Sequence, residues 1–125
     1  YKLSLFKSLN LYSLQKDHRL DQIKESNIEI FEFNNYDKDG LFSDTISLIN
    51  NLDLIITTDT SIAHLAGSMR KKVWVILNDV PEWRWMLNTN KSPWYELTEL
   101  FRCKKKDDWS TVFDQIENSL VQFKD

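Results

Sequence analysis

The sequence predicts an α/β fold, a Rossmann-like three-layer structure in which helices cover both faces of a mostly parallel sheet. Short apolar runs alternate along the chain with segments of helical periodicity, and this alternation is typical of βαβ units. Two of the runs are almost unbroken apolar, as strands covered on both faces should be. A chain of 125 residues with 42% hydrophobic content is long enough and apolar enough to form one domain, which is predicted over 1–125. The connections between its parallel strands are expected to be right-handed crossovers.

Strands are expected where short runs are rich in β-branched and aromatic residues. In chain order these runs are Leu9–Leu14, Ile28–Phe33, Leu52–Thr57, Val73–Leu77 and a weaker candidate, Glu96–Phe101. The third and fourth runs are the two that are nearly unbroken. The sheet is therefore expected to have its most buried strands in the middle of the chain.

The first predicted helix covers residues 42–52. Phe42, Ile46 and Ile49 follow one another at three- and four-residue steps and therefore share one face. Ser43 or Asp44 is placed to cap the start of this helix.

Two further helices follow. A short one is predicted over 60–69, with Gly67 near its C-terminal end. A longer amphipathic helix is predicted over 109–123, capped near Ser110. Its apolar face consists of Phe113, Ile116, Leu120 and Phe123.

Composition excludes several classes of function. The net charge of −3 argues against a general nucleic-acid binder, which needs a basic face, and the run Lys104–Lys106 is expected to be a solvated loop. The single cysteine, Cys103, excludes an internal disulfide and a paired-cysteine zinc site, and it fits a reducing, cytoplasmic compartment. No run approaches the roughly 20 apolar residues of a membrane span, and no signal peptide is visible. The chain starts at Tyr1 rather than Met, which leaves open that it belongs to a longer protein.

The junction between the third strand and the second helix reads "DTSIAHLAG", Asp59–Gly67. In an open parallel sheet, ligands lie beyond the carboxyl ends of the strands, and the first amides of a helix have no intrahelical partners. A phosphate at this end would satisfy those amides, with hydroxyl donors from Thr60 and Ser61 and a ring nitrogen from His64. The same residues also suit an ordinary capped helix, so the pattern alone leaves both interpretations open.

A family resemblance supports the anion site. "DTSIAHLAG" followed by "KKVWVIL" (Lys71–Leu77) resembles the D-T-S/G-x-x-H-L-A-x-A-x-G-K/R-P-V signature of heptosyltransferase-like glycosyltransferases. With "WRW" (Trp83–Trp85), "SPWY" (Ser92–Tyr95) and "YSLQKD" (Tyr12–Asp17), the chain is similar to the C-terminal glycosyltransferase-like domain of bacterial tetratricopeptide-repeat proteins. The resemblance covers almost the whole chain from about Tyr12 onward.

The resemblance implies the nucleotide-sugar-binding half of a GT-B glycosyltransferase. In that family this segment holds the donor diphosphate, so Thr60, Ser61 and His64 are expected at the phosphates, while Asp59 orders the loop. Gln15 and Lys16 are expected near the base or the ribose, with an exposed loop as the alternative. The nucleotide sugar is a substrate, and no cofactor or metal is implied.

An aromatic segment follows the strand "VWVIL". Trp83 or Trp85 can form a lid that stacks on a nucleotide base, with Arg84 donating to a phosphate or carboxylate. The alternative is that these aromatics pin a long loop to the sheet, and this alternative is favoured for Trp94 and Tyr95.

The sequence also departs from the family pattern. Lys72 stands where the family usually has proline, and Asn78 and Asp79 stand where relatives often have Leu-Pro; Asp79 adds negative charge near the anion. Asp37 and Asp39 are candidates for a general base or for metal ligands, but their position in a polar turn with Gly40 is the better explanation of these residues.

The N-terminal GT-B half is missing from the pattern. The first strand of a GT-B C-terminal domain is expected either to be absent or to be replaced in part by the segment Tyr1–Ser8. The chain alone is therefore not expected to transfer a sugar, no catalytic residue is assigned, and an N-terminal half or tetratricopeptide repeats are the expected partners. A receiver domain is disfavoured because the first strand lacks an acidic pair. The stronger alternative is a degenerate, non-catalytic interaction module attached to such repeats.

Overall fold

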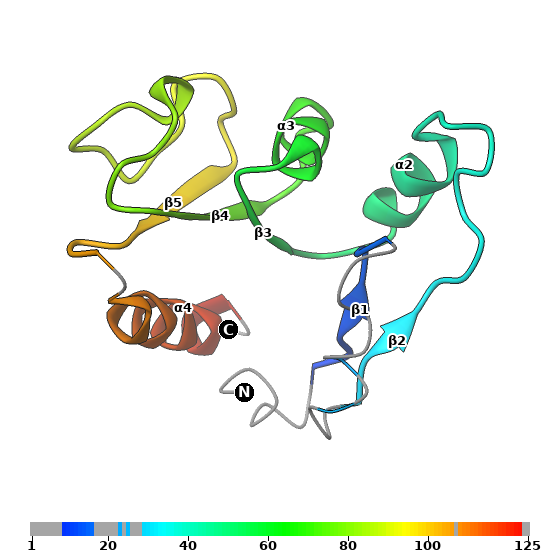
Figure 1. The fold of residues 1–125 in the computed structure, drawn as a ribbon, viewed down its shortest axis with the longest axis horizontal. Coiled ribbons are helices and arrows are strands. Elements are labelled where there is room, and N and C mark those ends of the chain that lie inside the picture. Colours follow the sequence, from blue (N-terminus) through cyan, green and yellow to red (C-terminus); the bar gives the residue numbers. More distant parts are fainter. Residues whose placement is uncertain (1–8, 17–22, 24, 26–28, 107, 124–125) are drawn as a thin grey trace. The chain divides into compact units, whose positions relative to one another are not determined.

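The computed structural model describes residues 9–16, 23, 25, 29–106 and 108–123. The chain forms two compact units, Tyr1–Thr45 and Ile46–Asp125 (Figure 1). Every described strand pairing between named strands is parallel, and the predicted α/β class with a Rossmann-like arrangement is confirmed. The single-domain organisation over 1–125 stays a prediction.

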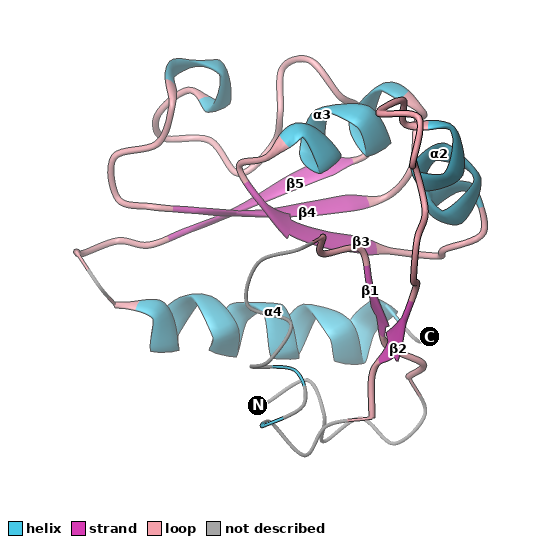
Figure 2. Ribbon diagram, turned by 45° about the vertical axis from the view of Figure 1, so that its right-hand side comes forward, coloured by secondary structure: helices cyan, strands magenta, loops and turns pink. Residues whose placement is uncertain are grey.

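The second unit contains a three-stranded parallel sheet in the order β3-β4-β5. Its strands are β3 (Ile55–Thr58), β4 (Val73–Leu77) and β5 (Thr98–Arg102). Two helices, α3 (Ser61–Ser68) and α4 (Trp109–Phe123), cover opposite faces of this sheet, which gives three layers (Figures 1 and 2). The unbroken apolar run of β4 is buried on both sides, as the sequence predicts for a central strand.

Small residues allow α3 to lie close to one face of the sheet. Ala63 and Ala66 are fully buried, and a helix with such short side chains can approach the backbone of a sheet closely. On the other face, Trp74 packs its ring against Phe101 and Phe123, with ring centroids 5.2 and 6.1 Å apart. Small residues of α3 therefore meet one face of the sheet, and the rings of Trp74, Phe101 and Phe123 pack together on the other face.

Helix α4 begins and ends at the predicted residues, but its buried face is rotated. Val112, Ile116 and Leu120 are buried, whereas Phe113 is 39% exposed, so its assignment to the apolar face was wrong. A three- and four-residue spacing fits more than one stripe on a helix, and contact with the sheet selects one of them. At the start of α4, near Ser110, the carboxylate of Asp108 accepts from Thr111 Oγ1 and Ser110 Oγ, and these hydrogen bonds lower the pKa of Asp108.

The first unit contains a short parallel pair, β1 (Tyr12–Ser13) and β2 (Phe31–Glu32). The ring of Tyr12 stacks on that of Phe31 at 5.1 Å. Both strands lie inside the predicted runs but are shorter than them, and Ile28 lies outside the described residues.

Helix α2 (Ser43–Asn50) is capped from a distance rather than by its own first residues. Asp37 accepts hydrogen bonds from the amides of Asp44 and Thr45, and the Asp44 carboxylate accepts from the Asp37 amide in return. The prediction that Ser43 or Asp44 caps this helix was therefore wrong, because Asp37 accepts the hydrogen bonds from its first amides. Of the apolar face predicted for α2, Ile49 is buried while Phe42 and Ile46 are exposed.

The carboxylate of Asp37 is buried and paired. Lys16 Nζ lies 2.7 Å from Asp37 Oδ2, and Thr45 Oγ1 donates to the same oxygen. Burial acts to raise the pKa of Asp37, but the hydrogen bonds from Lys16, Thr45 and Asp44 outweigh it and leave that pKa well below its usual range. The turn with Gly40, which has φ of 76°, is as predicted, and Asp37 serves as a helix cap within it.

None of the helices in the described ranges has both the length and the apolar character that a membrane crossing requires.

Candidate functional site

The candidate site lies where β3 ends and α3 begins, at the carboxyl edge of the parallel sheet. Thr60 is the N-cap residue of α3 and is extended, with φ of −138° and ψ of 171°, and its side chain makes no capping hydrogen bond. Its hydroxyl instead lies 3.1 Å from that of Thr57. The first amides of α3 are therefore not capped by Thr60, and the helix dipole adds about half a positive charge at this end.

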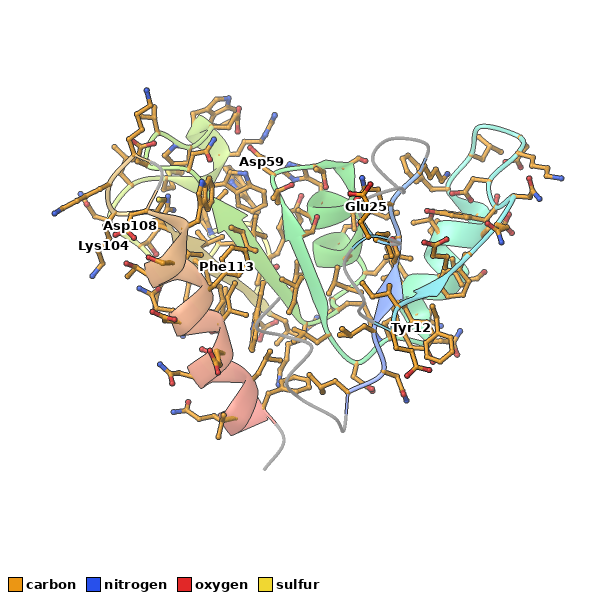
Figure 3. All side chains as sticks on the ribbon, turned by 60° about the horizontal axis from the view of Figure 1, so that its bottom comes forward. Tyr12, Glu25, Asp59, Lys104, Asp108 and Phe113 are labelled. Atoms are coloured by element: carbon orange, nitrogen blue, oxygen red, sulfur yellow. The ribbon has the colours of Figure 1, made fainter. Side chains whose placement is uncertain are left out.

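The hydroxyl-bearing residues of this turn face solvent. Thr60 and Ser61 are both exposed, so a solute can reach the start of the helix. Asp59 lies on the loop that joins β3 to α3 (Figure 3).

His64 is held one turn into α3 by three neighbouring side chains. Its Nδ1 lies 3.0 Å from the hydroxyl of Tyr95, and its ring stacks on Trp85 with centroids 4.9 Å apart and planes inclined by 21°. Its Nε2 lies 3.8 Å from Asp59 Oδ1. One nitrogen therefore faces the buried aromatic cluster, and the other faces the loop before α3.

Asp59 has two opposite effects at this loop. Its carboxylate favours a proton on the facing nitrogen of His64, which orients the ring. It also places a negative charge beside the start of α3, where it opposes the binding of an anion.

Gly67 lies near the C-terminal end of α3, as predicted. Gly67 lies inside the helix and is buried, and the left-handed residue after the helix is Arg70, with φ of 56°. A Cβ at position 67 would lie 2.6 Å from Cγ of Tyr95. Glycine is needed here because the ring of Tyr95 occupies the space of a side chain.

The aromatic segment forms a short 3₁₀ helix, η2 (Trp83–Trp85), whose two tryptophans have opposite environments. Trp85 is fully buried beneath His64, so it cannot cover a nucleotide base. Trp83 is 68% exposed, and the Arg84 guanidinium lies 5.5 Å from the centre of its ring. Of the two residues considered for a lid, Trp83 alone has a free face.

Hydrogen bonds fix this segment in place. Glu82 accepts from the Arg84 amide at 3.0 Å and pairs with Arg84 Nε at 3.1 Å. Trp94 Nε1 donates to the carbonyl of Arg84 at 2.8 Å, which agrees with the loop-pinning role favoured for Trp94.

Arg102 is a polar residue of this unit for which the sequence predicted no role. Its Nε donates to the carbonyl of Thr89 at 2.8 Å and its Nη2 to that of Trp85, so it ties the aromatic loop to the end of β5. Its Nη1 is buried with no hydrogen-bond partner among the described residues, and burial lowers the pKa of the guanidinium. Thr98, Leu100 and Arg102 are alternate residues of β5 and therefore lie on the same face of the strand, where Thr98 and Leu100 are buried. This alternation is the feature of the sequence that could have identified Arg102.

Gln15 and Lys16 belong to the first unit, and their expected place near a base or ribose stays a prediction. The Gln15 amide donates to Ser13 Oγ at 3.3 Å. Lys16 pairs with Asp37, and its Nζ lies 4.4 Å from the centre of the Tyr36 ring. The charge of Lys16 is therefore engaged in holding the cap of α2.

Within the residues that the structure describes, no group of three or more histidine, cysteine, aspartate or glutamate side chains is placed to hold a metal ion. Comparison of the chain with protein-family models, with curated proteins and with solved structures found no match.

Proposed function

We propose that the β3–α3 turn binds the diphosphate of a nucleotide sugar, and that the chain is the donor-binding portion of a glycosyltransferase. The observation that carries this proposal is the start of α3, where Thr60 and Ser61 are exposed at the carboxyl edge of a parallel sheet and the Thr60 side chain makes no capping hydrogen bond. Positive charge and free donors coincide at that point, which is what a diphosphate needs.

Each of the predicted phosphate ligands has a role consistent with its place. Thr60 and Ser61 offer amides and hydroxyls at the first turn, and both are exposed. His64 offers Nε2, which faces the loop at Asp59, while its Nδ1 is engaged by Tyr95. Asp59 orders the loop through His64 and does not bind the anion itself.

Trp83 is the residue that we propose for stacking on the base of the nucleotide. Its ring is exposed, and hydrogen bonds from the Arg84 amide to Glu82 and from Trp94 Nε1 to the Arg84 carbonyl fix the backbone beside it, so that less entropy is lost on binding. Arg84 lies beside this ring and would contribute a cation, although Glu82 partly neutralises it.

We assign no catalytic residue to this chain. Transfer of a sugar to an acceptor requires the N-terminal half of a GT-B enzyme, and we propose that the chain acts with such a half or with tetratricopeptide repeats in a longer protein. We also propose a cytoplasmic location, where nucleotide sugars are substrates and the buried thiol of Cys103 would stay reduced.

A second candidate function is a non-catalytic interaction module. The segment between β4 and β5 has several exposed large apolar side chains, and exposed apolar surface can mark a contact with another protein. These residues are Val80, Trp83, Met86, Leu87, Trp94 and Leu97. This reading needs no ligand at the start of α3.

Titration of the chain with uridine, guanosine and adenosine diphosphates at up to millimolar concentration distinguishes the two functions. Calorimetric heat or saturation transfer with one of them is expected for the donor-binding portion. His64→Ala should weaken that binding by about 1–2 kcal/mol, or roughly 5- to 30-fold, because it removes one charge-assisted hydrogen bond. Gln122→Ala, an exposed change on α4 at the opposite face of the sheet, is the matched control and should leave affinity unchanged. Absence of binding with all three nucleotides would favour the interaction module.

A further inference from the structure

We propose that Tyr95 is a positioning residue that sets which nitrogen of His64 carries the proton, so that Nε2–H faces the start of α3 as a donor. This inference rests on the proposed diphosphate site and deepens it. Tyr95 itself acts through His64 and is not proposed to touch the ligand.

The geometry around His64 leaves the two nitrogens with different partners. The hydroxyl of Tyr95 lies 3.0 Å from Nδ1 in a half-buried position. The carboxylate of Asp59 lies 3.8 Å from Nε2. The ring cannot turn over freely, because it is stacked on the fully buried Trp85 and meets the edge of Tyr95 at 5.9 Å.

The tautomer follows from what these partners can do. A carboxylate only accepts, so it favours a proton on the facing Nε2. A neutral imidazole then has a lone pair on Nδ1, and that lone pair requires a donor. The phenolic hydroxyl of Tyr95 supplies this donor, whereas a phenylalanine ring cannot. The pair Tyr95 and Asp59 therefore selects the Nε2–H form, which points a donor toward the loop where the phosphate is proposed to lie.

Tyr95 can serve this purpose because its own place is fixed. Its ring fills the space at Gly67, where a Cβ would meet ring atoms at 2.6 and 2.8 Å. Its amide donates to Ser92 Oγ at 3.3 Å, and its carbonyl accepts from the Thr98 amide at 3.1 Å, at the first residue of β5. The hydroxyl is thus held by the helix on one side and by the sheet on the other.

The test is Tyr95→Phe in the full chain, which removes the hydroxyl and keeps the ring. Long-range nitrogen–proton correlation spectra of the unliganded protein, recorded near pH 8.5 where histidines are neutral, report the tautomer of His64. The signals are assigned by comparison with His64→Ala. Tyr36→Phe is the matched control, because it removes a hydroxyl that donates to the Leu14 carbonyl at 2.7 Å in the other unit.

We expect the wild type and Tyr36→Phe to show the Nε2–H form of His64, and Tyr95→Phe to show a mixture of the two forms. The affinity of Tyr95→Phe for the best-binding nucleoside diphosphate should fall about threefold to tenfold, less than the loss of a whole hydrogen bond to the ligand. An unchanged tautomer in Tyr95→Phe would overturn the inference even if the wild type binds the nucleotide. A changed tautomer without any nucleotide binding by the wild type would overturn the proposed function and leave the role of Tyr95 toward His64 in place.

Discussion

The imidazole of His64 lies flat on the indole of Trp85, with ring centroids 4.9 Å apart and planes 21° from parallel. Trp85 comes from the loop after β4 and His64 from α3, so this contact ties the aromatic segment to the helix that starts at the candidate site. Trp85 is therefore buried whereas Trp83 is exposed, and the two residues are expected to differ in their contributions to stability.

Trp85→Ala should destabilise the protein strongly, by about 3–5 kcal/mol, because it opens a cavity beneath His64. Chemical denaturation followed by circular dichroism measures this loss. Trp83→Ala should change stability by no more than about 0.5 kcal/mol, since its ring is largely in solvent. Equal destabilisation by the two variants would contradict the structure.

Trp83→Ala should nevertheless weaken binding of the nucleoside diphosphate if the base stacks on it. Loss of one base–aromatic contact corresponds to about 1–3 kcal/mol. The measurement is calorimetric titration, with Gln122→Ala, an exposed change on α4, as the control. If Trp83→Ala binds as tightly as the wild type, Trp83 has no part in base recognition.

Gly67→Ala should destabilise the protein by about 1–3 kcal/mol, although alanine is the better helix former by about 1 kcal/mol. The added methyl group would meet the ring of Tyr95 at 2.6 Å, and the ring would have to move. Thermal unfolding measures the change. A higher melting temperature for Gly67→Ala would show that the ring does not occupy this space.

Combining Gly67→Ala with Tyr95→Ala is the matching control. Removal of the ring makes room for the methyl group, so the second substitution should make Gly67→Ala neutral or stabilising. The helix propensity of alanine would then be the remaining effect.

Asp37→Asn should lower the melting temperature at neutral pH and reduce the acid sensitivity of the protein. The folded-state pKa of Asp37 lies below its value in the unfolded chain, about 3.9. The stabilisation is therefore fully present above that pH and is lost as the pH falls below about 4 through the folded-state pKa. Melting curves between pH 7 and pH 3 should fall less steeply for the variant than for the wild type.

Asp39→Asn is the control for this measurement. Asp39 is exposed in the same turn, and its carboxylate accepts from the Leu41 amide at 3.0 Å. An Asp39→Asn variant that lost as much stability as Asp37→Asn would argue against the buried cap.

Asp59→Asn should strengthen binding of a nucleoside diphosphate, because it removes a negative charge beside the start of α3 and keeps a side chain of similar size. An increase of about twofold to fivefold is expected at low salt, and it should shrink as ionic strength rises. Titrations at two salt concentrations measure it. Weaker binding at both concentrations would show that the carboxylate orders the loop more than it repels the anion.

The sequence by itself determined the elements of the fold. Each of the five predicted strand runs overlaps a described strand, and α4 occupies the predicted residues. These features were predictable because apolar periodicity and β-branched composition act locally and identify burial without knowledge of the partner. The place of the β3–α3 junction at a strand's carboxyl end followed from the same pattern.

Only the tertiary structure decided which side chains contact one another and which of them are buried. Asp37 caps α2 by accepting a hydrogen bond from the amide of Asp44, seven residues further along the chain. Position 67 requires glycine because the ring of Tyr95, 28 residues away in the sequence, occupies the space of a side chain there. Trp83 and Trp85 are the same residue type two positions apart, yet one is exposed and the other fully buried. Such distinctions depend on which atoms share a space in the folded chain, and linear spacing carries no information about contacts between distant segments.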